Sequence, residues 1–168
     1  PVDSLYLGQT PPGNTPIVFN LPMSTGLRTV ERITISSDGK EIIYSELDTY
    51  PPTILKIRYF KYNGTAWQGP FDLLSGYNAT ALSPNDSILY MQKDVEGIPT
   101  THYSVRTDTG WSAPVRMFSS SQQSHYLQQT NLKNYYLASI FPGFSKSDLG
   151  VLVINGTDTT IKNLGKPI

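Results

Sequence analysis

The sequence predicts an all-β fold, and three observations support that prediction. Aromatic and turn-forming residues are abundant, with 11 Tyr, 13 Gly and 13 Pro among 168 residues, whereas only 15% of residues are charged. This composition is typical of short β-strands joined by many turns. A pattern of apolar strand, polar turn and second apolar or aromatic strand also occurs three times. In addition, no segment shows the apolar periodicity of a long helix.

The repeated pattern sets the size of the building unit. Its copies lie at residues 33–44, 81–90 and 127–137, and the last copy is the most degraded. Tyr44 precedes Tyr90 by 46 positions, and Tyr90 precedes Leu137 by 47 positions. A period of this length is typical of β-propellers, whose blades are four-stranded antiparallel sheets. We therefore expect a β-propeller-type fold with about three four-stranded antiparallel blades.

The strands of each predicted blade follow from local chemistry. Ile33 and Ile35 alternate with polar residues in the first strand, and the pair Asp38-Gly39 forms a tight turn. A proline is tolerated in the outer strand because one edge of that strand needs no hydrogen-bond donor. The expected strands cover residues 33–35, 41–45, 54–62 and 67–73, then 79–82, 88–92, 102–107 and 111–117, and then a third set between 125 and 165.

The predicted organisation is a single propeller-type domain with a lead-in arm. Residues 1–30 contain Pro11, Pro12, Pro16 and Pro22, a density that excludes a central strand or a helix from most of the segment. The boundaries that we predict are residues 1–30 for the Pro-rich arm, 31–75 for blade 1, 76–120 for blade 2 and 121–168 for blade 3.

Several short motifs resemble those of the TolB-type, WD-like β-propeller repeat family. The motifs are Ser36-Ser37-Asp38-Gly39-Lys40, Ser83-Pro84-Asn85-Asp86, the two Trp-x-x-Pro stretches that begin at Trp67 and Trp111, and the closing residues 163–168. The lead-in residues 6–13 are similar to the start of exported Bacteroidetes members of this family. The resemblance implies an extracytoplasmic recognition platform and supplies no catalytic motif.

The resemblance also raises the question of ring closure, since family members usually close a ring of about six blades. Three blades would leave two exposed sheet edges, which favour aggregation. Three alternatives follow: the chain is a fragment of a six-bladed propeller, a second copy completes the ring as a homodimer, or the blades stack in another way.

Charge and cysteine content narrow the classes of partner. Thirteen Lys and Arg balance 13 Asp and Glu, and no basic stripe is present, so we expect no nucleic acid partner. The absence of cysteine excludes disulfides and Cys-ligated zinc. No apolar run has the length of a membrane span. By resemblance we expect a periplasmic or extracellular location, with a lipid anchor on the precursor as one alternative.

Candidate binding residues lie where the innermost strand of each predicted blade begins. If the ring model holds, these positions face the mouth of the central channel and combine charged, amide, aromatic and imidazole groups. Such a mixture suits a protein, peptide or glycan partner. Packing of Tyr77 and Tyr126 between blades is the alternative. The candidate ligand-binding residues are Glu31, Arg32, Tyr77, Asn78, His125 and Tyr126.

We expect no cofactor and no metal site. A metal site would require His102 and His125 to meet carboxylates such as Asp94, Glu96 or Asp148, although the two histidines are 23 positions apart. His102 lies in a strand pattern, which indicates a solvent-facing or partly packed side chain.

The function that we predict is a non-catalytic recognition or scaffold module. One alternative is a carbohydrate-active enzyme that uses paired carboxylates from Glu46 and Asp48, near Tyr50. A solvated loop is the simpler interpretation of these three residues. A second alternative is a structural assembly module that pairs through exposed blade edges.

Overall fold

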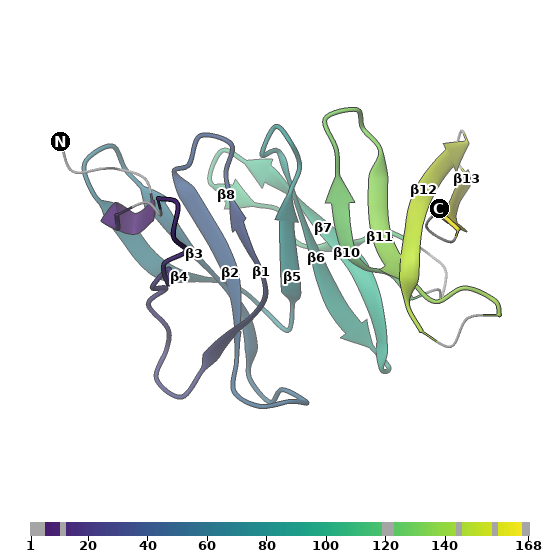
Figure 1. Ribbon diagram of the computed structural model, residues 1–168, viewed down its shortest axis with the longest axis horizontal. Helices are drawn as coiled ribbons and strands as arrows, with labels where there is room; N and C mark the ends of the chain where they lie inside the picture. The colour runs from purple at the N-terminus through teal and green to yellow at the C-terminus, as the bar shows by residue number, and fades with distance from the viewer. Residues whose placement is uncertain (1–5, 11–12, 119–122, 144–145, 156–157, 166–168) are drawn as a thin grey trace. The chain divides into compact units, whose positions relative to one another are not determined.

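The computed structural model describes residues 6–10, 13–118, 123–143, 146–155 and 158–165 (Figure 1). These residues form antiparallel β-sheets and one short 3₁₀ turn, η1 (Tyr6–Gly8). The predicted all-β fold is therefore confirmed. The chain divides into two compact units, Pro1–Asn78 and Ala79–Ile168.

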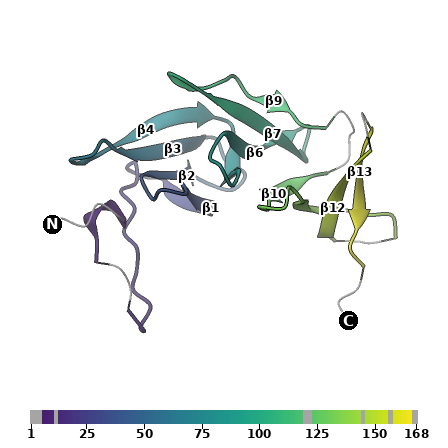
Figure 2. The same ribbon diagram turned by 90° about the horizontal axis from the view of Figure 1, so that it is seen from above.

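The first unit contains an arm and one four-stranded sheet, which we call sheet 1. The strands are β1 (Arg28–Ile35), β2 (Glu41–Leu47), β3 (Leu55–Tyr62) and β4 (Trp67–Ser75). They are hydrogen-bonded in chain order, and every neighbouring pair is antiparallel. The arm, which includes η1, runs beside this sheet before the chain enters β1 (Figure 2). Sheet 1 thus has the strand order expected of a propeller blade.

The second unit contains two further sheets. Sheet 2 consists of β5 (Asn78–Leu82), β6 (Ile88–Val95), β7 (Ile98–Thr107), β8 (Gly110–Trp111) and β9 (Val115–Arg116). Sheet 3 consists of β10 (His125–Gln129), β11 (Tyr135–Ser139), β12 (Asp148–Asn155) and β13 (Asp158–Asn163). Sheet 3 and strands β5 to β8 of sheet 2 follow chain order, whereas β9 pairs with β7. The first three strands of each sheet therefore share one order.

The outer strand of sheet 2 differs from the prediction of one continuous strand at residues 111–117. Two short pieces, β8 and β9, pair separately with β7. Pro114 lies between them and has no backbone N–H to donate to a ladder. In sheet 1 the corresponding Pro70 lies inside β4, where the pairing with β3 shifts register. The third repeat lacks this proline, and β13 pairs with β12 without a shift.

The turn between the first two strands of each sheet is built in the same way. A hydroxyl side chain at the start of the turn accepts a hydrogen bond from a backbone N–H at or just before the next strand. The pairs are Glu41 N–H to Ser36 at 2.8 Å, Ile88 N–H to Ser83 at 2.9 Å and Asn134 N–H to Thr130 at 3.2 Å. In each turn, a backbone N–H three residues on donates to the carbonyl of the same residue at 2.9 Å. The repeat therefore conserves a hydrogen-bonding role rather than a residue.

Each turn also contains one residue in the left-handed region. Gly39 has a φ of 70°, and the equivalent residues Asp86 and Lys133 have φ values of 58° and 61°. Glycine adopts this conformation without a steric penalty, whereas residues with a side chain do not. The second and third turns are consequently more strained than the first.

The core of the first unit lies between sheet 1 and the arm. Ile42, Tyr44 and Phe60 form a buried cluster on one face of the sheet. The arm contributes the partly buried side chains of Leu7, Phe19 and Leu21 to this cluster, and Trp67 of β4 also packs there. The arm therefore covers the sheet as a hydrophobic layer would.

The core of the second unit lies between sheets 2 and 3, which are side by side (Figures 1 and 2). Tyr90 of β6 packs in one cluster with Leu127, Leu137 and Leu152 of sheet 3. The Tyr90 hydroxyl donates a hydrogen bond to Oε1 of Gln129 at 3.0 Å. Aliphatic and aromatic packing thus joins the two sheets.

Candidate functional site

We call the first strand of each sheet its inner strand, and two of these strands, β1 and β10, are interrupted near their beginning by a β-bulge. In β1, Val30 pairs with Ser45 and the next pairing is made by Ile33, so two residues are inserted. In β10, His125 pairs with Ala138 and the next pairing is made by Gln128. Bulges re-aim side chains and are frequent next to functional sites.

A left-handed residue lies near the beginning of the first strand in each of the three sheets. Glu31 and Tyr126 lie within the two bulges and have φ values of 67° and 56°. Ala79, the second residue of β5, has a φ of 50°. Positive φ is uncommon for residues other than glycine and costs free energy, so it persists only where the surrounding structure enforces it. The three sheets thus share a strained backbone at the start of the inner strand.

The structure places the predicted binding residues around these positions. Glu31 is exposed and Arg32 half-buried, both in the β1 bulge. Tyr77 immediately precedes β5 and Asn78 begins it, and both side chains are half-buried. In the second inner strand the left-handed residue is Ala79, one position after the predicted pair.

His125 and Tyr126 begin β10 and form the best-defined part of the candidate site. Their rings are stacked, with centroids 4.8 Å apart and planes inclined by 28°. Both side chains are half-buried, so the stacked pair retains surface for a partner. Aromatic faces next to hydrogen-bonding groups are typical of sites that recognise peptides or sugars.

Two residues that the sequence analysis did not single out complete this cluster. His125 Nε2 lies 3.2 Å from Ser147 Oγ and 3.3 Å from Gln123 Nε2. With Gln123 oriented in this way, its amide nitrogen donates and Nε2 of His125 accepts, which places the proton of a neutral imidazole on Nδ1. The cluster therefore offers uncharged donors and acceptors beside an aromatic stack.

The topology explains how Ser147 reaches a histidine that is 22 positions away in the sequence. Strands β10 and β12 both pair with β11 in antiparallel fashion, so they run in the same direction. Ser147 immediately precedes β12, and His125 begins β10. The two residues consequently lie at the same end of sheet 3, a relation that the strand order alone would have indicated.

The second histidine has a packing role. His102 in β7 is buried, and its Nδ1 lies 3.3 Å from the carbonyl oxygen of Thr100. Burial lowers the pKa of His102 below its ordinary value because the charged form loses hydration. Among the described residues, no group of three or more His, Cys, Asp or Glu side chains is arranged to hold a metal ion.

Glu46 is not in a solvated loop, which corrects the interpretation made from the sequence. It lies in β2 with a fully buried carboxylate, 3.2 Å from Nη1 of Arg58. The backbone N–H of Ser24, in the arm, donates to the same carboxylate at 3.1 Å. Arg58 donates further hydrogen bonds to Ser24 Oγ and to the Pro70 carbonyl. Glu46 thus anchors the arm to sheet 1.

Asp48 is also committed to local structure. Its carboxylate accepts hydrogen bonds from the backbone N–H groups of Thr53 and Ile54, both at 3.0 Å, and from the Thr53 hydroxyl. These hydrogen bonds hold the pKa of Asp48 well below its ordinary value. A carboxyl group with a low pKa is a poor general acid at neutral pH. Asp48 therefore stabilises the loop between β2 and β3, and this structural role accounts for its presence there.

Comparisons with known proteins add a similarity of fold. No family model matches the chain, and no curated protein sequence matches it. Among solved structures, the chain is similar to a prolyl endopeptidase, with a TM-score of 0.46 and 11% identity over 92% of this chain. The chain spans only 30% of the length of that protein. In the part of the chain that the structure describes, no helix is long and apolar enough to cross a membrane.

Proposed function

We propose that the chain is a non-catalytic recognition module of the propeller type, which binds an extracytoplasmic protein, peptide or glycan partner. The observation that carries the proposal is the strained start of all three inner strands, at Glu31, Ala79 and Tyr126. Glu31 lies five residues before the turn residue Ser36, whereas Ala79 and Tyr126 lie four residues before Ser83 and Thr130. Ala79 is itself buried, so the strain there orients the neighbouring side chains. A strain that recurs within one position in three sheets is better explained by presentation of side chains than by packing within one sheet.

The His125 cluster is the contact surface that we assign to this function. Stacking of His125 on Tyr126 provides an aromatic face, while Gln123 and Ser147 provide an amide and a hydroxyl within 3.3 Å of the imidazole Nε2. Uncharged hydrogen-bonding groups beside a ring suit the hydroxyls of a sugar or the amides of a peptide. The resemblance to TolB-type propellers supports an exported recognition protein, periplasmic or extracellular.

The proposal is tested by probing glycan and peptide arrays with the labelled protein. We expect a variant that combines His125→Ala with Tyr126→Gly to lose retention at least ~10-fold on the probes that bind the unaltered chain. Glycine at position 126 keeps the left-handed backbone, whose φ is 56°. Tyr50→Ala is the matched control because Tyr50 is an exposed aromatic residue far along the chain. Unchanged retention by the double variant would refute the assigned surface.

The contact between Ser147 Oγ and His125 Nε2, at 3.2 Å, favours one catalytic alternative. A hydroxyl within hydrogen-bonding reach of an imidazole is the minimal arrangement of an activated nucleophile. A fluorophosphonate probe distinguishes the two functions, since it labels an activated serine covalently. Labelling that disappears in Ser147→Ala would establish this alternative, whereas we expect no labelling.

Completion of a ring by a second copy stays a prediction. Light scattering checks it, because a homodimer would have twice the chain mass of 18.7 kDa.

A further inference from the structure

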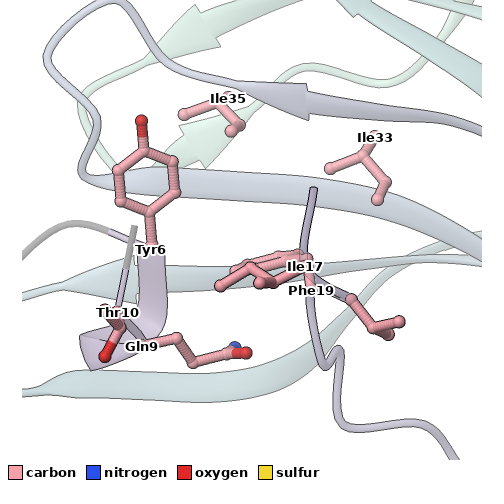
Figure 3. Close-up of a pocket in the computed structure, with 8 residues that line it drawn as sticks. Tyr6, Gln9, Thr10, Ile17, Phe19, Ile33 and Ile35 are labelled. Carbon is pink, nitrogen blue, oxygen red and sulfur yellow. The ribbon is translucent and has the colours of Figure 1, made fainter. Parts of the chain in front are cut away.

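The first unit contains an apolar cavity of about 290 Å³ between the arm and β1. Figure 3 shows the Tyr6 side chain pointing from η1 toward Ile35, with Gln9 and Thr10 on the arm side. Among the described residues, no charged side chain lines the cavity, and the polar side chains that line it are those of Tyr6, Gln9 and Thr10. The lining residues are Tyr6, Gln9, Thr10, Ile17, Val18, Phe19, Ile33 and Ile35.

The register of the sheets identifies the equivalent place in the second unit. Ile33 and Leu127 each lie three residues before the hydroxyl residue that begins the turn, Ser36 or Thr130. By the same count, Ile35 corresponds to Gln129. Leu127 is 3% exposed, whereas Ile33 is 49% exposed. The same sheet position is therefore covered in sheet 3 and uncovered in sheet 1.

A tyrosine occupies this place in the second unit. Tyr90 packs in the cluster of Leu127, and its hydroxyl donates to the Gln129 side chain at 3.0 Å. In the first unit no described side chain fills the corresponding space, because the arm covers Tyr44 and Phe60 but leaves the cavity over Ile33 and Ile35. Tyr90 thus shows that a tyrosine side chain fits against the sheet positions of Leu127 and Gln129, which correspond to Ile33 and Ile35.

The size and lining of the cavity agree with such an occupant. An apolar cavity of about 150 Å³ holds one benzene molecule, so about 290 Å³ accommodates a substituted ring. Thr10 and Tyr6 both line the cavity, and their hydroxyls are groups that can hydrogen-bond a phenolic hydroxyl, as the Gln129 amide bonds that of Tyr90.

The arm is held in a strained shape at this cavity. Tyr6 and Leu7 have φ values of 52° and 55°, although neither is glycine. The Gln9 side chain joins two parts of the arm by hydrogen bonds to the backbone of Asn20. Its Nε2 donates to the Asn20 carbonyl at 2.7 Å, and its Oε1 accepts from the Asn20 N–H at 2.9 Å. Consecutive left-handed residues cost about 1–2 kcal/mol each. Strain of this kind persists where the structure enforces it and gathers at binding sites.

We infer that this cavity is a binding site for a tyrosine-type side chain of a polypeptide partner. The ring lies against Ile33 and Ile35 as Tyr90 lies in the cluster of Leu127, and Tyr6 and Phe19 provide the aromatic walls. The site is independent of the His125 cluster and of the function proposed for it.

Methyl NMR of the isoleucine side chains tests this inference, with N-acetyl-tyrosinamide as the probe. We expect saturable shifts at Ile17, Ile33 and Ile35, with a Kd on the order of 1 mM for so small a ligand. N-acetyl-alaninamide should cause no saturable shift because it lacks the ring. If p-cresol binds and the tyrosine amide does not, the cavity accepts a free phenol but not a tyrosine side chain of a polypeptide, and the inference is wrong.

Two matched variants separate the cavity from general surface effects. Val18 lines the cavity and is 83% exposed, so Val18→Asp should leave the fold intact and weaken binding at least ~5-fold. Val115→Asp, at an exposed valine of β9, should leave the affinity unchanged. An unchanged Kd in Val18→Asp would overturn the inference. Concentration-dependent shifts of the same methyl groups without any probe would also overturn it, since they would assign the cavity to a second copy.

Discussion

Sheet 1 and sheet 3 present equivalent faces that are covered in different ways. In sheet 3, Leu137 and Leu152 pack against Tyr90 of sheet 2. In sheet 1, the residues of the same register, Tyr44 and Phe60, pack against the arm. The arm therefore takes the role of a neighbouring sheet, although η1 is the only regular element among its described residues before β1.

The difference shows what an irregular segment needs in order to replace a sheet. The interface between sheets 2 and 3 has a continuous apolar cluster. The arm combines a smaller apolar cluster with polar anchors, in which Ser24 N–H meets Glu46 and the Tyr44 hydroxyl donates to the Pro22 carbonyl at 2.7 Å. Buried polar contacts fix one geometry because leaving them unmade is costly.

The largest effect that we expect is from removal of Arg58. Arg58→Ala leaves the fully buried Glu46 carboxylate without its cation, which should destabilise the first unit by about 3–5 kcal/mol. Chemical denaturation measures the loss. Lys61→Ala is the control, since the pair between exposed Lys61 and Glu41 is 4.0 Å long and should contribute at most about 1 kcal/mol. Equal losses in both variants would contradict the anchoring role of the buried pair.

A smaller effect is expected from alkaline pH. Burial, followed by the nearby Glu46 carboxylate, raises the pKa of Tyr44 to about 12, against 10.0 for an unperturbed tyrosine. Between these values the unfolded chain loses the proton while the folded chain keeps it. Stability from this group is therefore complete below pH 10 and is lost as the pH rises toward 12, by on the order of 2 kcal/mol.

Denaturation at pH 8–12 checks this expectation. In Tyr44→Phe, the number of protons released on unfolding between pH 10 and 12 should fall by one. Burial also raises the pKa of Tyr90, so Tyr90→Phe should act in the same direction in the second unit. A pH dependence that is unaltered in Tyr44→Phe would show that this hydroxyl is not buried against the arm.

Much of the fold could be predicted from local patterns, because turns and strands depend on nearby residues. The turn at Asp38-Gly39 and the strand with Ile33 and Ile35 are examples. The split of the outer strand at Pro114 was missed, although the missing N–H of proline was a local signal.

The candidate sites were harder to predict because they depend on contacts between distant residues. Glu46 is buried because Arg58 stands on the neighbouring strand and Ser24 on the arm. Ser147 reaches His125 only through the strand order of sheet 3. The cavity over Ile33 depends on the path of the arm, which no periodicity encodes.

The smallest effect that we expect concerns strain in the repeated turn. Lys133→Gly removes a side chain from a residue whose φ is 61°, and should stabilise the second unit by about 0.5–1 kcal/mol. Gly39→Ala introduces a side chain at a φ of 70° and should destabilise the first unit by about 1–2 kcal/mol. Thermal unfolding of both variants compares the turns. Destabilisation by Lys133→Gly would show that the third turn does not share the backbone of the first.

The central claim, that the arm replaces a neighbouring sheet but covers less of the face, is tested most directly by truncating one equivalent residue in each unit. Leu127→Ala should lower the free energy of unfolding by about 2–5 kcal/mol because Leu127 is 3% exposed beneath sheet 2. Ile33→Ala should lower it by only about 1 kcal/mol because Ile33 is 49% exposed at the cavity. Equal losses at the two positions in chemical denaturation would contradict the account.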